Sequence, residues 1–305
     1  MIDYLDEDVA YLLGMLVARG TIYEHRGHYT ITIEIPYSNI QIDDPPYDLK
    51  GDRNALLVSI DKIINRLSEL TTNTPTKHAG DNSVSIVFKI SRRTIFVRNI
   101  EMLLNKKKDY TEFSIPIQIF ESPLNIKKEF MRGFADVNGK VRKTNDYYRG
   151  EHRIYIDVLN KNWNLPIQLC YLLQGHLNIP VQTLTWGHPN LRNSPEEKWT
   201  KREHQIKIFN NDFEEIGFYI EHKNKKSTQF AKENKKMEIS GKSCDPLIKM
   251  ARKPRIKPAH PDENNKDLPK ELRKKHYDSF WEICRDLGCE EFNKQKSMGN
   301  FIKEK

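Results

Sequence analysis

The stretch that decides the fold is Lys127–Val141, KKEFMRGFADVNGKV. It begins with two lysines, continues through apolar and small residues, and breaks at Asn138-Gly139 before a short basic run. This pattern is typical of a helix that ends at a glycine and passes directly into a strand. We therefore expect a helix over roughly 124–137, followed at once by a strand.

An earlier stretch, Asp6–Ile22 (DEDVAYLLGMLVARGTI), has the same layout. Its glycines, Gly14 and Gly20, precede Gly133 and Gly139 by the same offset of 119 residues. A layout that recurs at a fixed offset indicates two copies of one structural unit.

The residues after each motif also follow one order, helix–strand–strand–helix–strand–strand–helix. Alternating apolar and polar residues predict the strands, and apolar residues at helical spacing predict the helices. The first copy has elements near 5–19, 21–24, 28–35, 54–70, 74–79, 83–90 and 92–104, then a proline-rich connector, 110–123. The second has elements near 124–137, 140–148, 152–159, 165–177, 181–187, 203–209 and 211–222. The expected fold class is α+β, a duplicated αββαββα unit.

The bulk composition is that of a polar globular chain. The 305 residues are 37% hydrophobic, and the mean hydropathy is −0.72. Apolar runs are too short to cross a membrane, and the N-terminus is acidic, unlike a signal peptide. Four cysteines are too few and too unevenly spaced for a disulfide framework, so we expect a cytoplasmic or nucleoid-associated protein.

The charge distribution points to a polyanionic partner. The net charge is +8, and the segment Glu221–His260 alone holds twelve lysines and arginines against four acids. A run of charge is often only a solvated surface. So strong a clustering of one sign favours contact with a phosphate backbone, and we expect 223–257 to be extended and to follow phosphates.

The two motifs, LLGMLVARG (Leu12–Gly20) and MRGFADVNG (Met131–Gly139), resemble the motif of the LAGLIDADG homing endonuclease family. The resemblance covers about residues 1–222. It implies one repeat over 1–122, a second over 123–222, and a basic C-terminal extension over 223–305. It also implies a monomer with an internal pseudo-two-fold axis.

In that family the two motif helices pack together through small residues, which here would be Gly14, Ala18, Gly133 and Val137. The sheets of the two halves would then form a saddle over double-stranded DNA. Strand side chains would read base edges in the major groove, while lysines and arginines would hold phosphates.

The chain departs from the family where the catalytic acids are expected. The residue before each terminal glycine is normally Asp or Glu, and the two acids hold divalent metal. Here these positions are Arg19 and Asn138. Arginine has no lone pair for a metal, and asparagine offers one neutral oxygen. Asp136 is the remaining motif acid, and its counterpart in the first motif is Val17.

We therefore expect a sequence-specific DNA-binding protein without cleavage at the usual site, either a recognition subunit of a larger assembly or a regulator. Arg19 would lie beneath the scissile phosphates, or would pair with a carboxylate such as Asp136 or Glu24. Two alternatives stay open. One is an active site-specific endonuclease with unusual residues and Mg²⁺, and the other is a maturase that binds intron RNA.

Substitute nuclease sites are weak, because the pairs Asp157/Lys161 and Glu203/Lys207 lack a flanking acid. Phosphate-binding glycine loops and hydrolase triads are not recognisable. The candidate DNA contacts are cations and aromatic residues on expected strands and on the long connection between the last two strands. They are Tyr23, His25, Arg26, His28, Lys89, Lys140, Arg142, Lys143, Tyr148, Arg149, Arg153, Trp186, His188, Asn190, Arg192, Lys198, Lys201 and Arg202.

The last segment of the chain gathers residues that bind zinc. Their side chains could staple a region with little core of its own through one tetrahedral zinc ion. Alternatively, Cys284 lies on the buried face of an amphipathic helix with Tyr277, Phe280 and Trp281. The candidate ligands are Cys244, His260, His276, Cys284 and Cys289.

Overall fold

The computed structural model describes residues 5–25, 27–42, 44, 48–71, 73–143, 152–159, 164–189, 202–239 and 255–257. The chain forms two compact units. Unit 1 comprises Met1–Ile156 and Phe209–Ser243, and unit 2 comprises Asp157–Ile208 and Cys244–Lys305. The expected division into 1–122, 123–222 and 223–305 remains a prediction.

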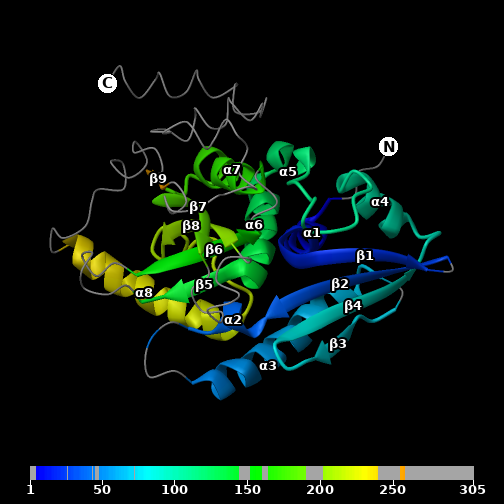
Figure 1. Cartoon of the computed structure of the whole chain (residues 1–305), viewed down its shortest axis with the longest axis horizontal. Helices are drawn as coiled ribbons and strands as arrows, with labels where there is room; N and C mark the ends of the chain where they lie inside the picture. Colours follow the sequence, from blue (N-terminus) through cyan, green and yellow to red (C-terminus); the bar gives the residue numbers. More distant parts are fainter. Residues whose placement is uncertain are drawn as a thin grey trace. The chain divides into compact units, whose positions relative to one another are not determined.

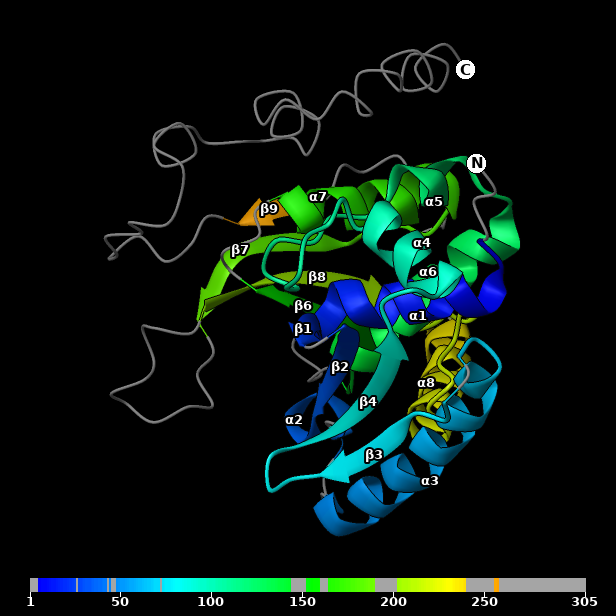
Figure 2. The same ribbon diagram turned by 90° about the vertical axis from the view of Figure 1, so that its right-hand side faces the viewer.

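Unit 1 contains an antiparallel sheet in which β1 (Gly20–His25), β2 (His28–Pro36), β4 (Ser83–Ser91) and β3 (Thr76–Ala79) are neighbours in that order. The alternation expected along β2 is confirmed, because Tyr29, Ile31, Ile33 and Ile35 are buried and their neighbours are not. The buried face packs on α1 (Glu7–Arg19) and α3 (Leu49–Ser68), as Figure 2 shows. The opposite face is free of any described helix.

Two helices with the same motif cross in the centre of unit 1, α1 and α6 (Leu124–Asn138) (Figure 1). A Cβ atom on Gly14 would lie 2.0 Å from the carbonyl oxygen of Phe130. A Cβ atom on Gly133 would lie 2.1 Å from that of Tyr11. Only glycine allows so close an approach of two backbones. The expected reciprocal contact through Gly14 and Gly133 is confirmed.

The other elements of unit 1 include two short helices that the sequence patterns did not predict, α2 (Tyr37–Ile40) and α5 (Ile117–Glu121). Both begin directly after a proline, and both are shorter than two helical turns, so hydrophobic periodicity cannot reveal them. The remaining elements are α4 (Ile95–Leu103), β5 (Gly139–Arg142), most of β6 (Arg153–Leu159) and α8 (Glu221–Ile239).

The prediction of a closing helix over 211–222 is wrong. Residues 210–216 form turns, and the helix is α8, which lies in the segment that we expected to be an extended phosphate-binding tail. The buried residues of α8 recur at helical spacing, but three of them are polar, namely Lys223, Ser227 and Asn234. A hydrophobic pattern therefore misses this helix.

Unit 2 contains the end of β6, from Asp157, and then β8 (Arg202–Phe209), β7 (Thr183–Pro189) and β9 (Arg255–Lys257) as neighbours in that order. Strand β7 is antiparallel to β8 and parallel to β9. Helix α7 (Asn164–Tyr171) continues into a π-helical turn, Leu172–His176, and carries the buried Cys170. Among the helices of the described residues, none combines the length and the apolar character that a membrane span requires.

Candidate nucleic-acid interface

The helices α1 and α6 end in the same way. At each end a glycine N–H caps the helix, from Gly20 to the Leu16 carbonyl and from Gly139 to the Ala135 carbonyl. The chain then turns directly into β1 or β5. This local geometry brings Arg19 and Asn138, the last residues of the two helices, together.

Arg19 and Asn138 are joined by a hydrogen bond in which Arg19 Nε donates to Asn138 Oδ1 over 2.8 Å. Asn138 is buried, and its Nδ2 donates to the Ala18 carbonyl over 3.2 Å. Asn39, from the unpredicted helix α2, donates to the Val137 carbonyl (3.1 Å) and to Asn138 Oδ1 (3.4 Å). The two residues that precede the terminal glycines of the motifs thus do meet, as one cation and one amide.

These residues do not fit a divalent metal ion. Mg²⁺ and Ca²⁺ bind anionic and carbonyl oxygens. The Arg19 guanidinium has no lone pair, and the Asn138 oxygen already accepts two hydrogen bonds. Within the described residues, no group of three or more His, Cys, Asp or Glu side chains is arranged to hold a metal.

Asp136 is fully buried and anchors the segment that leads into α8. Its carboxylate accepts hydrogen bonds from the Tyr11 hydroxyl (2.7 Å) and from the backbone N–H groups of Tyr219 (3.1 Å) and Ile220 (3.2 Å). Burial raises the pKa of Asp136 above its ordinary value, against the opposing effect of Lys223. Its contacts make Asp136 a structural residue.

Lys223 caps the end of α6 from inside the core. Its Nζ donates to the carbonyl oxygens of Ala135 (3.0 Å) and Asp136 (2.9 Å), and its side chain is fully buried. Burial lowers the pKa of Lys223 to about 7. A lysine that we expected to contact phosphate is therefore part of the protein interior.

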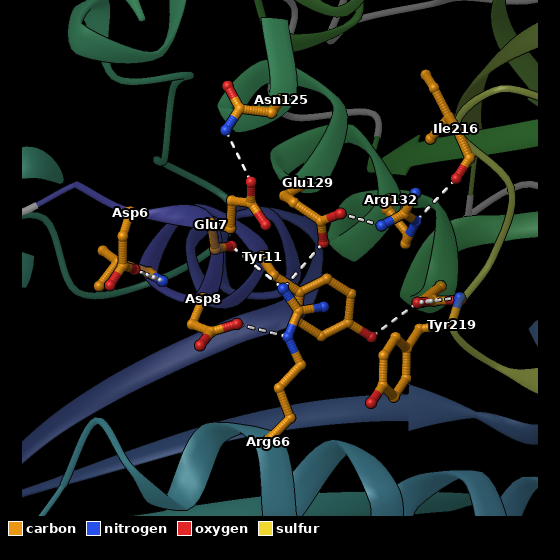
Figure 3. A network of polar contacts seen from close by, with 12 residues as sticks. Asp6, Glu7, Asp8, Tyr11, Arg66, Asn125, Glu129, Arg132, Ile216 and Tyr219 are labelled. Carbon is orange, nitrogen blue, oxygen red and sulfur yellow. Dashed lines mark hydrogen bonds and ion pairs between the residues drawn. The ribbon is translucent and has the colours of Figure 1, made fainter. Parts of the chain in front are cut away.

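A second polar network, which the sequence did not predict, joins the two motif helices at a position away from Arg19, toward their N-terminal ends (Figure 3). Arg66 of α3 contacts Asp8 of α1 (2.6 Å) and Glu129 of α6 (3.0 Å), and Glu129 also pairs with Arg132. The Arg66 guanidinium lies 4.5 Å from the ring centroid of Tyr11 and 5.2 Å from that of Tyr219. One arginine thus connects both motif helices with α3.

The side of the first sheet that no described helix covers, which we call the outer face, presents side chains in cross-strand rows. Lys89 stands in one row with Tyr23 and Thr30, and Glu34 stands in another with Ser85 and His78. All members are exposed or half-buried. The face comprises Thr21, Tyr23, His25, His28, Thr30, Thr32, Glu34, Thr76, His78, Ser85, Val87, Lys89 and Ser91.

Four predicted DNA contacts lie on the outer face, namely Tyr23, His25, His28 and Lys89. Tyr23 is 65% exposed, and its ring is stacked on that of His25. Sequence reasoning missed the threonines, serines and Glu34 beside them, because it sought only cations and aromatic residues. The polar positions of the alternation along 28–35 were the signal that could have found them.

The predicted contacts from the second motif have other surroundings. The Arg142 guanidinium lies over the Tyr155 ring at 4.8 Å, and that of Arg153 lies over Phe209 at 5.3 Å. Lys143 pairs with Asp44 over 3.0 Å, and Asp44 also contacts Lys226 of α8. Lys140 is buried in β5, so its side chain is not on the surface.

The structure gives no side-chain contacts for the remaining candidates. For Trp186, His188 and Arg202, only the positions in β7 and β8 are described. The other DNA-contact candidates outside the described residues are Arg26, Tyr148, Arg149, Asn190, Arg192, Lys198 and Lys201. The zinc candidates Cys244, His260, His276, Cys284 and Cys289 lie outside them too.

The paired motif helices, each followed by an antiparallel strand pair, give unit 1 a LAGLIDADG-like fold. Among solved structures, the chain is similar to the homing endonuclease I-DmoI in complex with DNA and Mn. The identity is 17% over 69% of this chain and 93% of that chain, with a TM-score of 0.34.

It is also similar to the homing endonuclease I-WcaI bound to its DNA recognition sequence (11% identity, 70% of this chain, 81% of that chain, TM-score 0.40). A third similar structure is the N-terminal LAGLIDADG domain of WhiA (14% identity, 70% of this chain, 79% of that chain, TM-score 0.37). No protein-family model and no curated protein matches the sequence.

Proposed function

We propose that this protein binds double-stranded DNA sequence-specifically through the outer face of its first sheet. The observation that carries the proposal is that face itself. It is a sheet surface free of described helices, with twelve of its thirteen residues polar or aromatic, on a chain whose net charge is +8. Solvent-facing sheet surfaces are commonly polar, and this one adds the widely exposed ring of Tyr23, stacked on His25, in the same row as Lys89.

The dimensions suit the major groove. The groove is about 12 Å wide and admits a two-stranded β-ribbon, and hydrogen-bonding side chains can there distinguish all four base pairs. The central strands β2 and β4 are paired antiparallel from His28 to Pro36, so their outer side chains form a continuous ribbon. Lysines and arginines elsewhere on the chain would supply the phosphate contacts that hold the duplex in register.

Binding proceeds without strand cleavage at the helix ends. Arg19 supplies a fixed positive charge at the position where the family holds metal, and its bond to Asn138 keeps that charge in place. The protein therefore acts as a recognition module, alone as a monomer or together with a catalytic or regulatory subunit. DNA affinity should not depend on divalent cations.

The test is selection of bound duplexes from a random pool, with and without EDTA, followed by a cleavage assay with Mg²⁺ or Mn²⁺ on the selected DNA. We expect an enriched sequence, equal affinity in both buffers, and intact strands. Failure to enrich any duplex would refute the proposal. Cleavage that disappears in Asn138→Ala would instead identify an active endonuclease, and displacement of the duplex by structured RNA would favour a maturase.

A further inference from the structure

The outer face carries its permanent charges at two positions. Among its described residues, Lys89 is the cation and Glu34 is the anion, while the other members are neutral or are histidines. Both side chains are exposed on strands whose backbones are fully paired. A lone charge on a hydrogen-bonding face contributes little to folding, because an exposed ion gains little from solvent-screened neighbours.

The register of the sheet fixes the spacing between Lys89 and Glu34. Lys89 of β4 is opposite Thr30 of β2, and Glu34 follows Thr30 by four residues on the same strand. At about 3.4 Å per residue, the two rows are about 14 Å apart. At this distance the two charges cannot form an ion pair, so each remains available to a partner.

Between the two charged rows lies a row that is rich in methyl groups. It consists of Thr21, Thr32, Val87 and Thr76, in register across all four strands of the sheet. Threonine and valine methyl groups contact the C5-methyl group of thymine in the major groove. The face thus runs from a donor, through methyl groups, to an acceptor.

We propose that Lys89 and Glu34 are the specificity-determining residues of this face. This assignment rests on the DNA-binding function proposed above. Lys89 donates to the O6 and N7 acceptors of a guanine, and Glu34 accepts from the N4 amino group of a cytosine, the pairings that base-edge chemistry favours. With about 3.4 Å between base pairs, the two bases lie about four base pairs apart. Thymines are preferred between them.

The test compares duplexes selected by the wild-type chain, by Glu34→Lys, by Lys89→Glu, and by the double variant that exchanges the two charges. We expect the wild type to prefer guanine and cytosine about tenfold over other bases at two positions four apart. Glu34→Lys should select guanine where the wild type selects cytosine. The double variant should exchange the two preferences and leave their spacing unchanged.

Control variants reverse a charge on α3 and on its C-cap residue, because α3 covers the opposite face of the same sheet. Lys50 of α3 and the C-cap residue Glu69 are both exposed, and Lys50→Glu and Glu69→Lys should leave the selected sequence as it is in the wild type. A wild-type chain that selects a defined duplex, with charge-exchanged variants that keep the same preferences, would overturn the assignment of Lys89 and Glu34. A wild-type chain that selects no duplex would overturn the DNA-binding function itself.

Discussion

Helices α1 and α6 share a motif but bury different chemistry. From Val9 to Ala18, the buried residues of α1 are apolar except for the hydroxyl of Tyr11. Helix α6 buries Glu129, Asp136 and Asn138 as well as its apolar residues. At the third position before the terminal glycine, α1 has Val17 and α6 has Asp136.

The difference follows from what packs on each helix. Helix α1 lies on a sheet whose strands satisfy one another's backbone groups. Helix α6 receives the segment before α8, whose Tyr219 and Ile220 N–H groups point into the core. Buried N–H groups need acceptors, and Asp136 provides them. Two copies of one motif can therefore keep the same helix contact while one copy acquires a second structural task.

The largest expected effect on stability comes from the close contact that α1 and α6 make through Gly14 and Gly133. Gly14→Ala and Gly133→Ala each place a Cβ atom about 2 Å from a backbone oxygen of the other helix. Each should lower the free energy of unfolding by about 3 kcal/mol or more, measured by urea denaturation. Gly80→Ala is the control, because its Cβ atom would meet nothing nearer than 3.4 Å. Equal stability of all three variants would contradict the close helix contact.

The next largest effect on stability comes from Asp136, the buried acid that α6 has and α1 lacks. Asp136→Asn keeps the shape of the side chain but removes the charge that accepts three hydrogen bonds, and should cost about 2–4 kcal/mol in urea denaturation. Asp61→Asn breaks an ion pair with Lys77 on the surface and should change stability by less than about 1 kcal/mol. If both variants cost the same, Asp136 does not anchor the returning segment.

A pH effect should accompany Lys223. The pKa of Lys223 is lowered to about 7 by burial, from an ordinary value of 10.5. Between these values the unfolded chain binds the proton more strongly, so stability gains with rising pH, on the order of 1 kcal/mol per pH unit. Below pH 7 both states are protonated and the contribution is constant. In Lys223→Met this gain should vanish, measured as the difference in unfolding free energy between the variant and the wild type from pH 7 to 9.

The smallest effect restores the symmetry of the two helix ends. In Arg19→Asp with Asn138→Asp, two carboxylates would face each other where the cation and amide now meet. The double variant should gain stability from Mg²⁺ or Ca²⁺, about 1.4 kcal/mol at a tenfold excess over the dissociation constant. Thermal unfolding with and without the ion measures this. An equal response of the wild type would show that the ion acts elsewhere.

Several features were predictable because they depend on local patterns. The alternation in 28–35 predicted a strand with one buried face, and the repeated glycines predicted two helices that end where strands begin. The reciprocal packing of Gly14 against Gly133, and the meeting of Arg19 with Asn138, followed from the resemblance and are seen in the structure. The duplication of the whole unit and the zinc site remain predictions.

Other features were not predictable, because their cause lies outside the local sequence. Helix α8 buries Lys223, Ser227 and Asn234, and each is stable there because its partner is provided by a distant segment. Asn234, for example, donates to the carbonyl of His152 and accepts from its N–H. A lysine-rich stretch cannot disclose which of its lysines has such a partner.

The sequence by itself determined where the strands alternate, where the motif helices end, and that a cation and an amide precede the two terminal glycines of the motifs. These depend on residue type and spacing along one segment. Only the tertiary structure decided that Lys223 is buried, that Arg66 joins both motif helices, and that Lys89 and Glu34 share an open face four residues apart in register. Those outcomes depend on which segments meet, because burial and partners set the charge state and the availability of each side chain.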